Sequence, residues 1–156
     1  MKIQTRAFGE VDIDDQKIIE FPEGIVGFPD LNHFTLIFDD EKGRDSIQWL
    51  QSIEEPGFAM PVMNPLIVLP DYNPAVDDEY LQPIGGIAED GMLVLVTVTV
   101  PIDIERLTVN LRGPIVINTE TRKGMQVILD DEKFEVKFPI YKILKENKDK
   151  KEKEGE

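Results

Sequence analysis

The feature that most constrains this fold is a period-two alternation of apolar and polar side chains, repeated in short runs. Near the N-terminus Ile3 alternates with Lys2 and Gln4, and the longest run covers residues 92–100. Successive side chains of a β-strand point to opposite faces, so this pattern predicts strands. Closing them into a barrel would leave no exposed sheet edge. We therefore predict a mainly β protein, a small antiparallel β-barrel-like domain of about ten short strands with one or two short helices.

The expected strands follow from these runs. They are residues 2–7 and 11–14 as a hairpin, 18–21, 34–38, 47–53, 92–100, 107–111, 115–119, 125–129 and 134–138. Residues 22–31 are rich in Pro and Gly and are expected to form a shaped loop, with one helical turn after Pro29. Residues 58–72 contain three prolines within an apolar stretch, and proline removes a ladder donor. Strands there are expected to be short, bulged or at an edge.

The best helix candidate begins at Asp77. Asp77 is placed to cap it, and Asp78 and Glu79 lie where the positive end of the helix dipole favours acidic groups. The pair Gly85-Gly86 is expected to end it.

The charge is distributed unevenly. The whole chain has a formal net charge of −14, residues 142–156 carry +1, and residues 1–141 therefore carry −15. We expect a single folded domain over 1–141 and a charged tail over 142–156 that is mobile or weakly helical. Direct nucleic-acid binding is disfavoured because it needs clustered Lys and Arg. An acidic body instead favours a basic partner, although acidity also serves solubility alone.

Few residues of this chain suit catalysis. There is no Cys, one His (His33) and two Ser (Ser46 and Ser52), which is a poor set for nucleophilic chemistry or soft metals. We therefore predict a binding protein rather than an enzyme, with no metal and no cofactor. The longest apolar run is too short to span a bilayer and the N-terminal residues show no signal core, so we expect a cytoplasmic protein without membrane contact.

The resemblance to a known family lies in five stretches. They are Leu107-Thr-Val-Asn-Leu-Arg-Gly-Pro-Ile-Val-Ile-Asn118, Asn64-Pro65, Leu69-Pro-Asp-Tyr72, Thr121-Arg-Lys-Gly-Met-Gln126 and Gly24-Ile-Val-Gly-Phe-Pro-Asp-Leu31. In order and spacing they resemble the FliW flagellar assembly factors. The resemblance covers residues 1 to about 141.

The resemblance implies a barrel-like β protein of the bacterial cytoplasm without enzymatic activity or cofactor. FliW proteins bind flagellin and also CsrA, a basic dimeric RNA-binding regulator. FliW held by CsrA relieves repression of flagellin translation, and FliW held by flagellin releases CsrA. Two features of this chain depart from the family pattern. An acidic residue would be expected where Asn64 precedes Pro65, and the Lys-rich tail is specific to this chain. We expect the free protein to be a monomer.

Eight residues are candidates for partner binding. They are Met63, Asn64, Asp71, Tyr72, Asp77, Asp78, Glu79 and Asn110. Asp71, Asp77, Asp78 and Glu79 are hypothesised to form an acidic surface that faces the basic partner.

Other roles remain open for these candidates. Helix capping is the favoured alternative for Asp77. Tyr72 is either an interface anchor or a turn residue. Core packing is favoured for Met63, and turn chemistry for Asn110.

Two other functions remain open. One is a flagellin chaperone that lacks the CsrA-binding role. The other is a small β-barrel enzyme, which would need two acidic side chains converging in a deep pocket.

Overall fold

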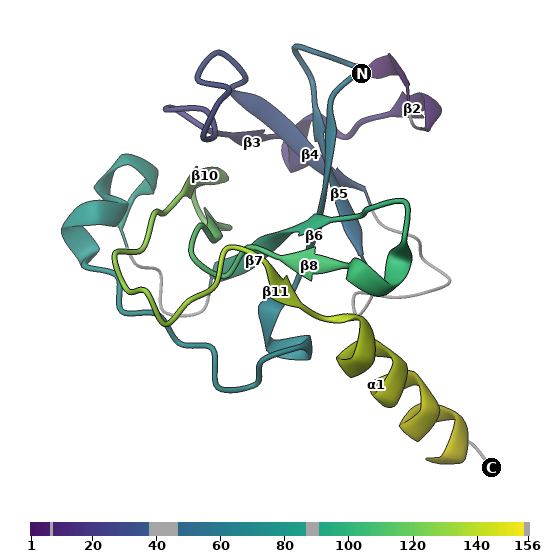
Figure 1. Cartoon of the computed structure of the whole chain (residues 1–156). Helices are drawn as coiled ribbons and strands as arrows, with labels where there is room; N and C mark the ends of the chain where they lie inside the picture. The colour runs from purple at the N-terminus through teal and green to yellow at the C-terminus, as the bar shows by residue number, and fades with distance from the viewer. Residues whose placement is uncertain (7, 38–46, 87–90, 155–156) are drawn as a thin grey trace.

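The fold, obtained as a computed structural model, is described for residues 1–6, 8–37, 47–86 and 91–154 (Figure 1). The strands of this part of the chain are β1 (Lys2–Thr5), β2 (Gly9–Asp12), β3 (Ile19–Glu20), β4 (His33–Ile37), β5 (Gln48–Ser52), β6 (Ala59–Met63), β7 (Met92–Thr99), β8 (Thr108–Val109), β9 (Ile115–Asn118), β10 (Lys123–Gln126) and β11 (Phe138–Pro139). The helical segments are the 3-10 helices η1 (Asp15–Lys17), η2 (Pro65–Ile67), η3 (Asp78–Ile84) and η4 (Ile104–Arg106), and the α-helix α1 (Tyr141–Glu154). The mainly β prediction is confirmed.

Seven strands close into a barrel. Their order is β7-β6-β5-β4-β3-β10-β9, and β9 pairs again with β7. Six of these seven pairings are antiparallel, as predicted, but β3 and β10 run parallel where Glu20 pairs with Lys123. The direction of β3 is set by its pairing with β4 and that of β10 by its hairpin with β9, so the two meet in parallel when the ring closes. β3 contributes only two residues to this seam.

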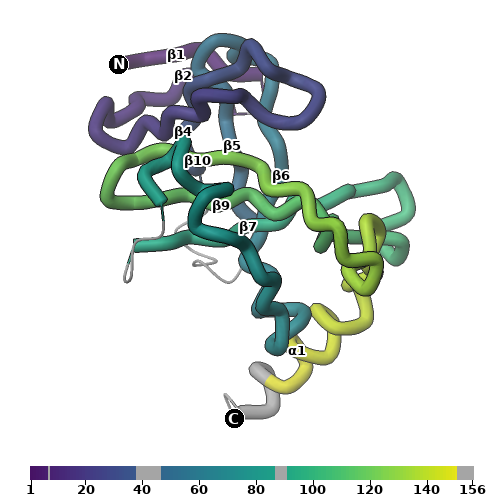
Figure 2. Tube along the Cα trace, turned by 90° about the vertical axis from the view of Figure 1, so that its left-hand side faces the viewer, coloured from purple at the N-terminus to yellow at the C-terminus, as the bar shows by residue number. Residues whose placement is uncertain are grey.

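The remaining strands extend or flank the barrel. β8 pairs with the end of β7, and β11 pairs with β8. The predicted N-terminal hairpin is confirmed as β1 and β2, with Lys2 opposite Asp12 and Thr5 opposite Gly9. This hairpin lies at one end of the molecule and α1 at the other (Figure 2).

The alternation along β7 divides its side chains between two hydrophobic cores. Val96 and Val98 belong to one core, called the first core below, whereas Leu95 belongs to the second core. On the second face burial is lost along the strand, because Leu95 is buried and Thr99 is exposed. A single strand with two apolar faces therefore joins both cores.

The proline-rich middle forms β6, which is not an edge strand. Pro61 pairs with Trp49 of β5, but the ladder to β7 includes only Val62 and Met63. The prediction of a short strand is confirmed. The proline is accommodated because the β7 ladder does not extend to it.

Some local predictions are wrong. Of the strand expected over 125–129, only Met125 and Gln126 are in a strand, because β10 ends at Gln126. No helical turn follows Pro29; residues 29–30 form a turn after the Ile25–Phe28 bridge. Of the strand expected over 134–138, only Phe138 is in a strand. The alternation was misleading there because Phe134 is buried against the Tyr72 ring while Val136 is 48% exposed. Ala7 and Phe38, at the ends of two expected strands, fall outside the described residues.

The predicted helix after Asp77 is present, but as the 3-10 helix η3. Asp77 occupies the N-cap position, yet its side chain makes no capping hydrogen bond, so the expected capping role is wrong. Tyr80 N–H bonds the Asp77 backbone carbonyl instead. Gly85 ends the helix as predicted, with φ +97°.

Residues 142–154, for which a mobile or weakly helical segment was expected, lie in α1. Tyr141, Ile143 and Leu144 pack against the first core, and Asn147 Nδ2 donates to the Ile67 carbonyl at 3.3 Å. These contacts hold the first turns of α1 on the body. Among the helices of the described residues, none is both long enough and apolar enough to cross a membrane.

Candidate functional site

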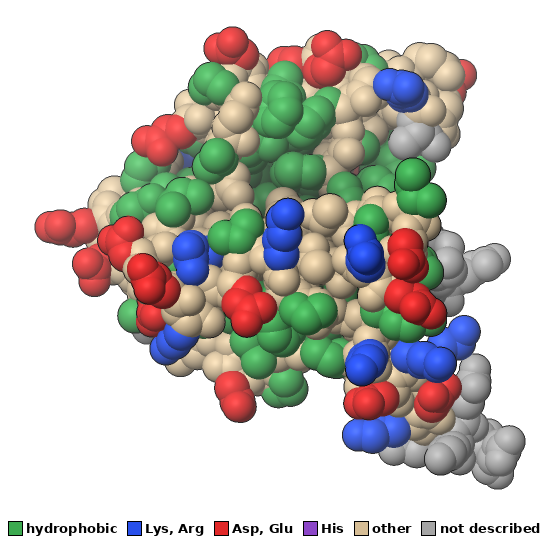
Figure 3. All heavy atoms as spheres, in the orientation of Figure 1, with side chains coloured by type: hydrophobic (Ala, Val, Ile, Leu, Met, Phe, Trp, Pro, Cys, Tyr) green, Lys and Arg blue, Asp and Glu red, His purple; other side chains and the backbone are tan. Residues whose placement is uncertain are grey.

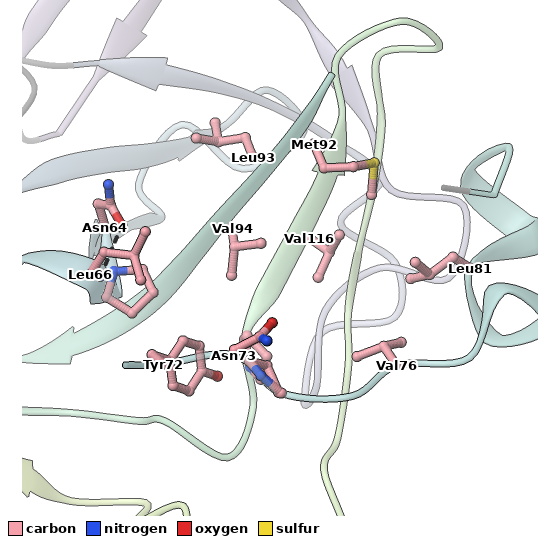
Figure 4. A pocket seen from close by; sticks show the side chains of 13 residues that line it. Asn64, Leu66, Tyr72, Asn73, Val76, Leu81, Met92, Leu93, Val94 and Val116 are labelled. Atoms are coloured by element: carbon pink, nitrogen blue, oxygen red, sulfur yellow. Dashed lines mark hydrogen bonds between the residues drawn. The ribbon is translucent and has the colours of Figure 1, made fainter. Parts of the chain in front are cut away.

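One candidate site is a surface hollow of about 460 Å³, called the apolar hollow below. It is lined by Asn64, Pro65, Leu66, Tyr72, Asn73, Pro74, Val76, Leu81, Met92, Leu93, Val94, Pro114 and Val116. Figure 4 shows Val94 and Val116 side by side at its centre, with Leu66 at one end and Leu81 at the other. Leu66 is 49% exposed, so the hollow offers accessible apolar surface.

Asn64 shapes one end of the apolar hollow through its side chain. Its Oδ1 accepts a hydrogen bond from Leu66 N–H at 3.0 Å and caps η2, whose first residue is Pro65. Asp and Asn cap helices about equally well. Asn64 therefore serves this capping role as well as the acidic residue expected there would.

Tyr72 lies in the wall of the hollow but is not an exposed anchor. The residue is 6% exposed, and its hydroxyl donates to the Leu111 carbonyl at 2.7 Å. Burial raises the pKa of the Tyr72 phenol to about 12. The tyrosine is therefore a neutral hydrogen-bonded part of the core, with its ring edge-on to Phe134 at 5.3 Å between centroids.

A second hollow of about 410 Å³ borders the first, and is called the acidic hollow below. It is lined by Asn73, Ala75, Val76, Asp77, Tyr80, Val127, Ile128, Leu129, Asp130, Asp131, Lys133 and Phe134. Asn73 and Val76 line both hollows. The Tyr72–Phe134 ring pair also links them, since each hollow contains one of the two rings. One continuous surface therefore carries an apolar part and an acidic part.

The predicted acidic residues are all exposed, but only one of them lines a hollow. Asp77 lies in the wall of the acidic hollow, whereas Asp71, Asp78 and Glu79 line neither hollow. Asp78 accepts a hydrogen bond from Gln82 Nε2 at 3.0 Å. On the face drawn in Figure 3, acidic side chains gather at the left, where η3 lies in Figure 1.

Two predicted binding residues, Met63 and Asn110, stabilise the fold instead of lining the candidate surface. Met63 is 1% exposed in the first core, so it is removed from the candidate surface. Asn110 Oδ1 accepts from Arg112 N–H and Gly113 N–H at 3.0 and 3.1 Å. This confirms the turn chemistry favoured for Asn110. Neither residue lines a hollow.

Sequence reasoning missed several exposed residues of this surface. They include Leu66, Tyr80, Asp130 and Asp131. Asp130 and Asp131 directly follow a run that was expected to be a strand, and no local pattern marks them as binding residues. Their relation to Asp77 is not visible in the sequence because about fifty residues separate them.

The described residues hold no group of three or more His, Cys, Asp or Glu that could bind a metal ion. His33 pairs with Glu54 instead, with 2.6 Å between Nδ1 and Oε2. Glu54 also accepts from the backbone N–H groups of Asn32 and His33. This pair fastens the start of β4 to the end of β5.

Comparison with known proteins identifies one family throughout. The family model described as "FliW protein" matches residues 2–140. A flagellar assembly factor FliW of Lachnospira eligens is 46% identical over 93% of this chain and 97% of that protein. One of Lachnoclostridium phytofermentans is 42% identical over 97% of each chain.

A solved structure agrees with these matches. It is the crystal structure of a flagellar assembly factor FliW, 30% identical in sequence, which superposes with a TM-score of 0.81. The match covers 90% of this chain and 97% of the other.

Proposed function

Because the chain belongs to the FliW family of flagellar assembly factors, we propose that it binds flagellin and the RNA-binding translational regulator CsrA. By holding CsrA it relieves repression of flagellin translation, and by holding flagellin it releases CsrA. In this proposal the protein acts in the cytoplasm, by binding and not by catalysis, and touches neither membrane nor RNA.

The observation that carries the CsrA part of the proposal is the charge of the body. Residues 1–141 have a net charge of −15, and CsrA is a basic protein that binds RNA phosphates. Opposite net charges accelerate encounter and orient the partners. The same negative field repels RNA, so the bound regulator would be less accessible to its message.

The apolar hollow supports the flagellin part. Flagellin is proposed to place an apolar segment against Leu66, Val94 and Val116, which line a hollow of about 460 Å³. Burial of such a segment would be favourable by roughly 25 cal/mol per Å² of apolar surface removed from water. This observation is also the one that favours the second candidate function, a flagellin chaperone that does not bind CsrA.

The test is calorimetric titration of the protein with purified CsrA from the same organism, at low and at moderate salt. We expect tight binding that weakens as salt rises, because screening shortens the reach of the −15 body. Tight but salt-insensitive binding would assign the affinity to apolar contacts. No binding at either salt, together with binding of flagellin, would leave the chaperone function.

A further inference from the structure

We infer that the acidic hollow is the surface that receives an arginine- or lysine-bearing segment of a protein partner. The inference rests on the proposed function and narrows it, because it moves the basic-partner contact from the exposed start of η3 to a defined hollow. The inference gives a role in partner binding to Tyr80 and Asp130, which the sequence did not single out.

Two walls from distant parts of the chain form this hollow. Residues 73–80 provide one wall, and the loop after β10, residues 127–134, provides the other. Val127, Leu129 and Phe134 are at most 7% exposed and form an apolar floor, whereas Tyr80 and Ile128 are 46% and 49% exposed at the rim. An apolar floor with an aromatic rim suits the long aliphatic stem of Lys or Arg.

The charges of the hollow leave room for an incoming cation. Asp77, Asp130 and Asp131 face a single Lys133 among its lining residues, a net of −2. Within the part of the chain that the structure describes, the carboxylates of Asp77 and Asp130 make no hydrogen bond and no ion pair. Each is therefore available to a guanidinium or ammonium group.

Lys133 already shows how this hollow holds a cation. Its Nζ lies 3.5 Å from Asp131 Oδ2 and 5.1 Å from the centroid of the Phe134 ring. Asp131 is oriented for this by accepting the Lys133 backbone N–H at 3.1 Å. Lys133 thus contacts both a carboxylate and an aromatic ring. The exposed Tyr80 and the unpaired Asp77 and Asp130 would offer the same two kinds of contact to a second cation.

The test compares two double variants that remove the same charge. Asp77→Asn with Asp130→Asn neutralises the acidic hollow, and Asp71→Asn with Glu79→Gln neutralises exposed neighbours outside it. We expect the first pair to weaken CsrA binding by about tenfold or more and the second by no more than about threefold. Equal losses would mean that only the long-range field matters, and would overturn the inference.

A probe without CsrA separates this inference from the proposed function. A blocked tetrapeptide of alternating arginine and leucine is titrated into the isotopically labelled protein, and backbone amide shifts are followed by NMR. We expect saturable shifts around Tyr80, Ile128 and Asp131 that vanish in the hollow variant and persist in the control variant. Shifts spread evenly over the acidic surface, or none at the hollow, would refute the inference even if CsrA binds. Failure of CsrA binding with peptide shifts at the hollow would refute only the regulator part of the function.

Discussion

Tyr72 shows how a role that the sequence leaves open is decided by a contact with a distant residue. Its place between Pro70 and Pro74 left an interface anchor and a turn residue equally open, but the ring is buried and its hydroxyl bonds the Leu111 carbonyl. No local pattern reveals this bond, because 39 residues separate its partners.

Replacing Tyr72 with Phe tests this bond. The variant is expected to lose about 1–3 kcal/mol of unfolding free energy, because a buried carbonyl loses its donor. The folded phenol, with a pKa of about 12, keeps its proton above the unfolded value near 10, so wild-type stability falls as pH rises through this window. The stability difference between wild type and variant should therefore shrink at alkaline pH.

Denaturant titrations at neutral and alkaline pH measure this difference. Tyr80→Phe is the matched control, because Tyr80 is 46% exposed and should leave stability within about 0.5 kcal/mol. A Tyr72→Phe loss that stays constant up to the highest pH would contradict the pKa assignment.

The Glu54 carboxyl gives a second prediction, which concerns stability at acidic pH. Desolvation raises the pKa of its carboxyl, but hydrogen bonds from the His33 ring and backbone outweigh this and hold it below 4.5. The stabilisation is therefore present above the unfolded pKa and is lost as pH falls through the lowered folded value.

Glu54→Gln should therefore lower the unfolding free energy by less than about 1 kcal/mol at about pH 6, because the His33–Glu54 pair is partly exposed. This loss should become smaller as the pH falls towards about 3. Thermal unfolding across this range measures the loss, with Glu55→Gln as the neighbouring exposed control. A cost that grows on acidification would contradict the assignment.

At the scale of elements, the seam between β3 and β10 is where the barrel closes. Gly124 of β10 lies there beside Phe21, and a Cβ at position 124 would be 2.7 Å from the Phe21 ring. Phe21 is fully buried and cannot move aside easily.

We expect Gly124→Ala to cost about 1–3 kcal/mol through overpacking. Gly57→Ala is the control, because a Cβ at position 57 would meet only the flexible Glu55 side chain, whose Oε1 would lie 3.4 Å away. Chemical denaturation compares the two. If both substitutions were equally mild, close packing would not hold the seam.

Helix α1 is the second element whose role can be tested. An isolated helix of its length is marginal in water, so its contacts with the first core should stabilise it. Ile143→Ala with Leu144→Ala is expected to cost about 1–3 kcal/mol, since both side chains are partly buried, and to reduce helical circular dichroism. Glu146→Ala with Lys148→Ala, both exposed and together charge-neutral, should do neither. Unchanged stability and helicity in the first variant would support a tail independent of the body.

At the scale of the whole molecule, the dominant property is the −15 charge of residues 1–141. Such a charge opposes compaction through self-repulsion, and added salt screens it. We expect the unfolding temperature to rise as NaCl increases from roughly 10 mM to about 300 mM, where the Debye length falls below about 10 Å. Scanning calorimetry at several salt concentrations measures this, and a falling temperature would show that specific ion pairs outweigh the repulsion.

Much of the β architecture could be predicted because alternation is local. Residues 2–5 and 92–99 report their strands directly, and Gly85 reports the end of η3. The same reasoning failed at residues 134–137, where burial of Phe134 comes from a tertiary contact with Tyr72.

The sequence by itself determined the β class, most of the strands, the acidity of the body and, through five matching stretches, the family. These depend on side-chain period and residue identity, which are properties of the chain alone. Only the tertiary structure decided which seven strands close the barrel and in what order, the parallel seam, and the meeting of Asp77 with Asp130 across the acidic hollow. Each of these depends on contacts between segments far apart in the chain, and no local pattern encodes which distant segments meet.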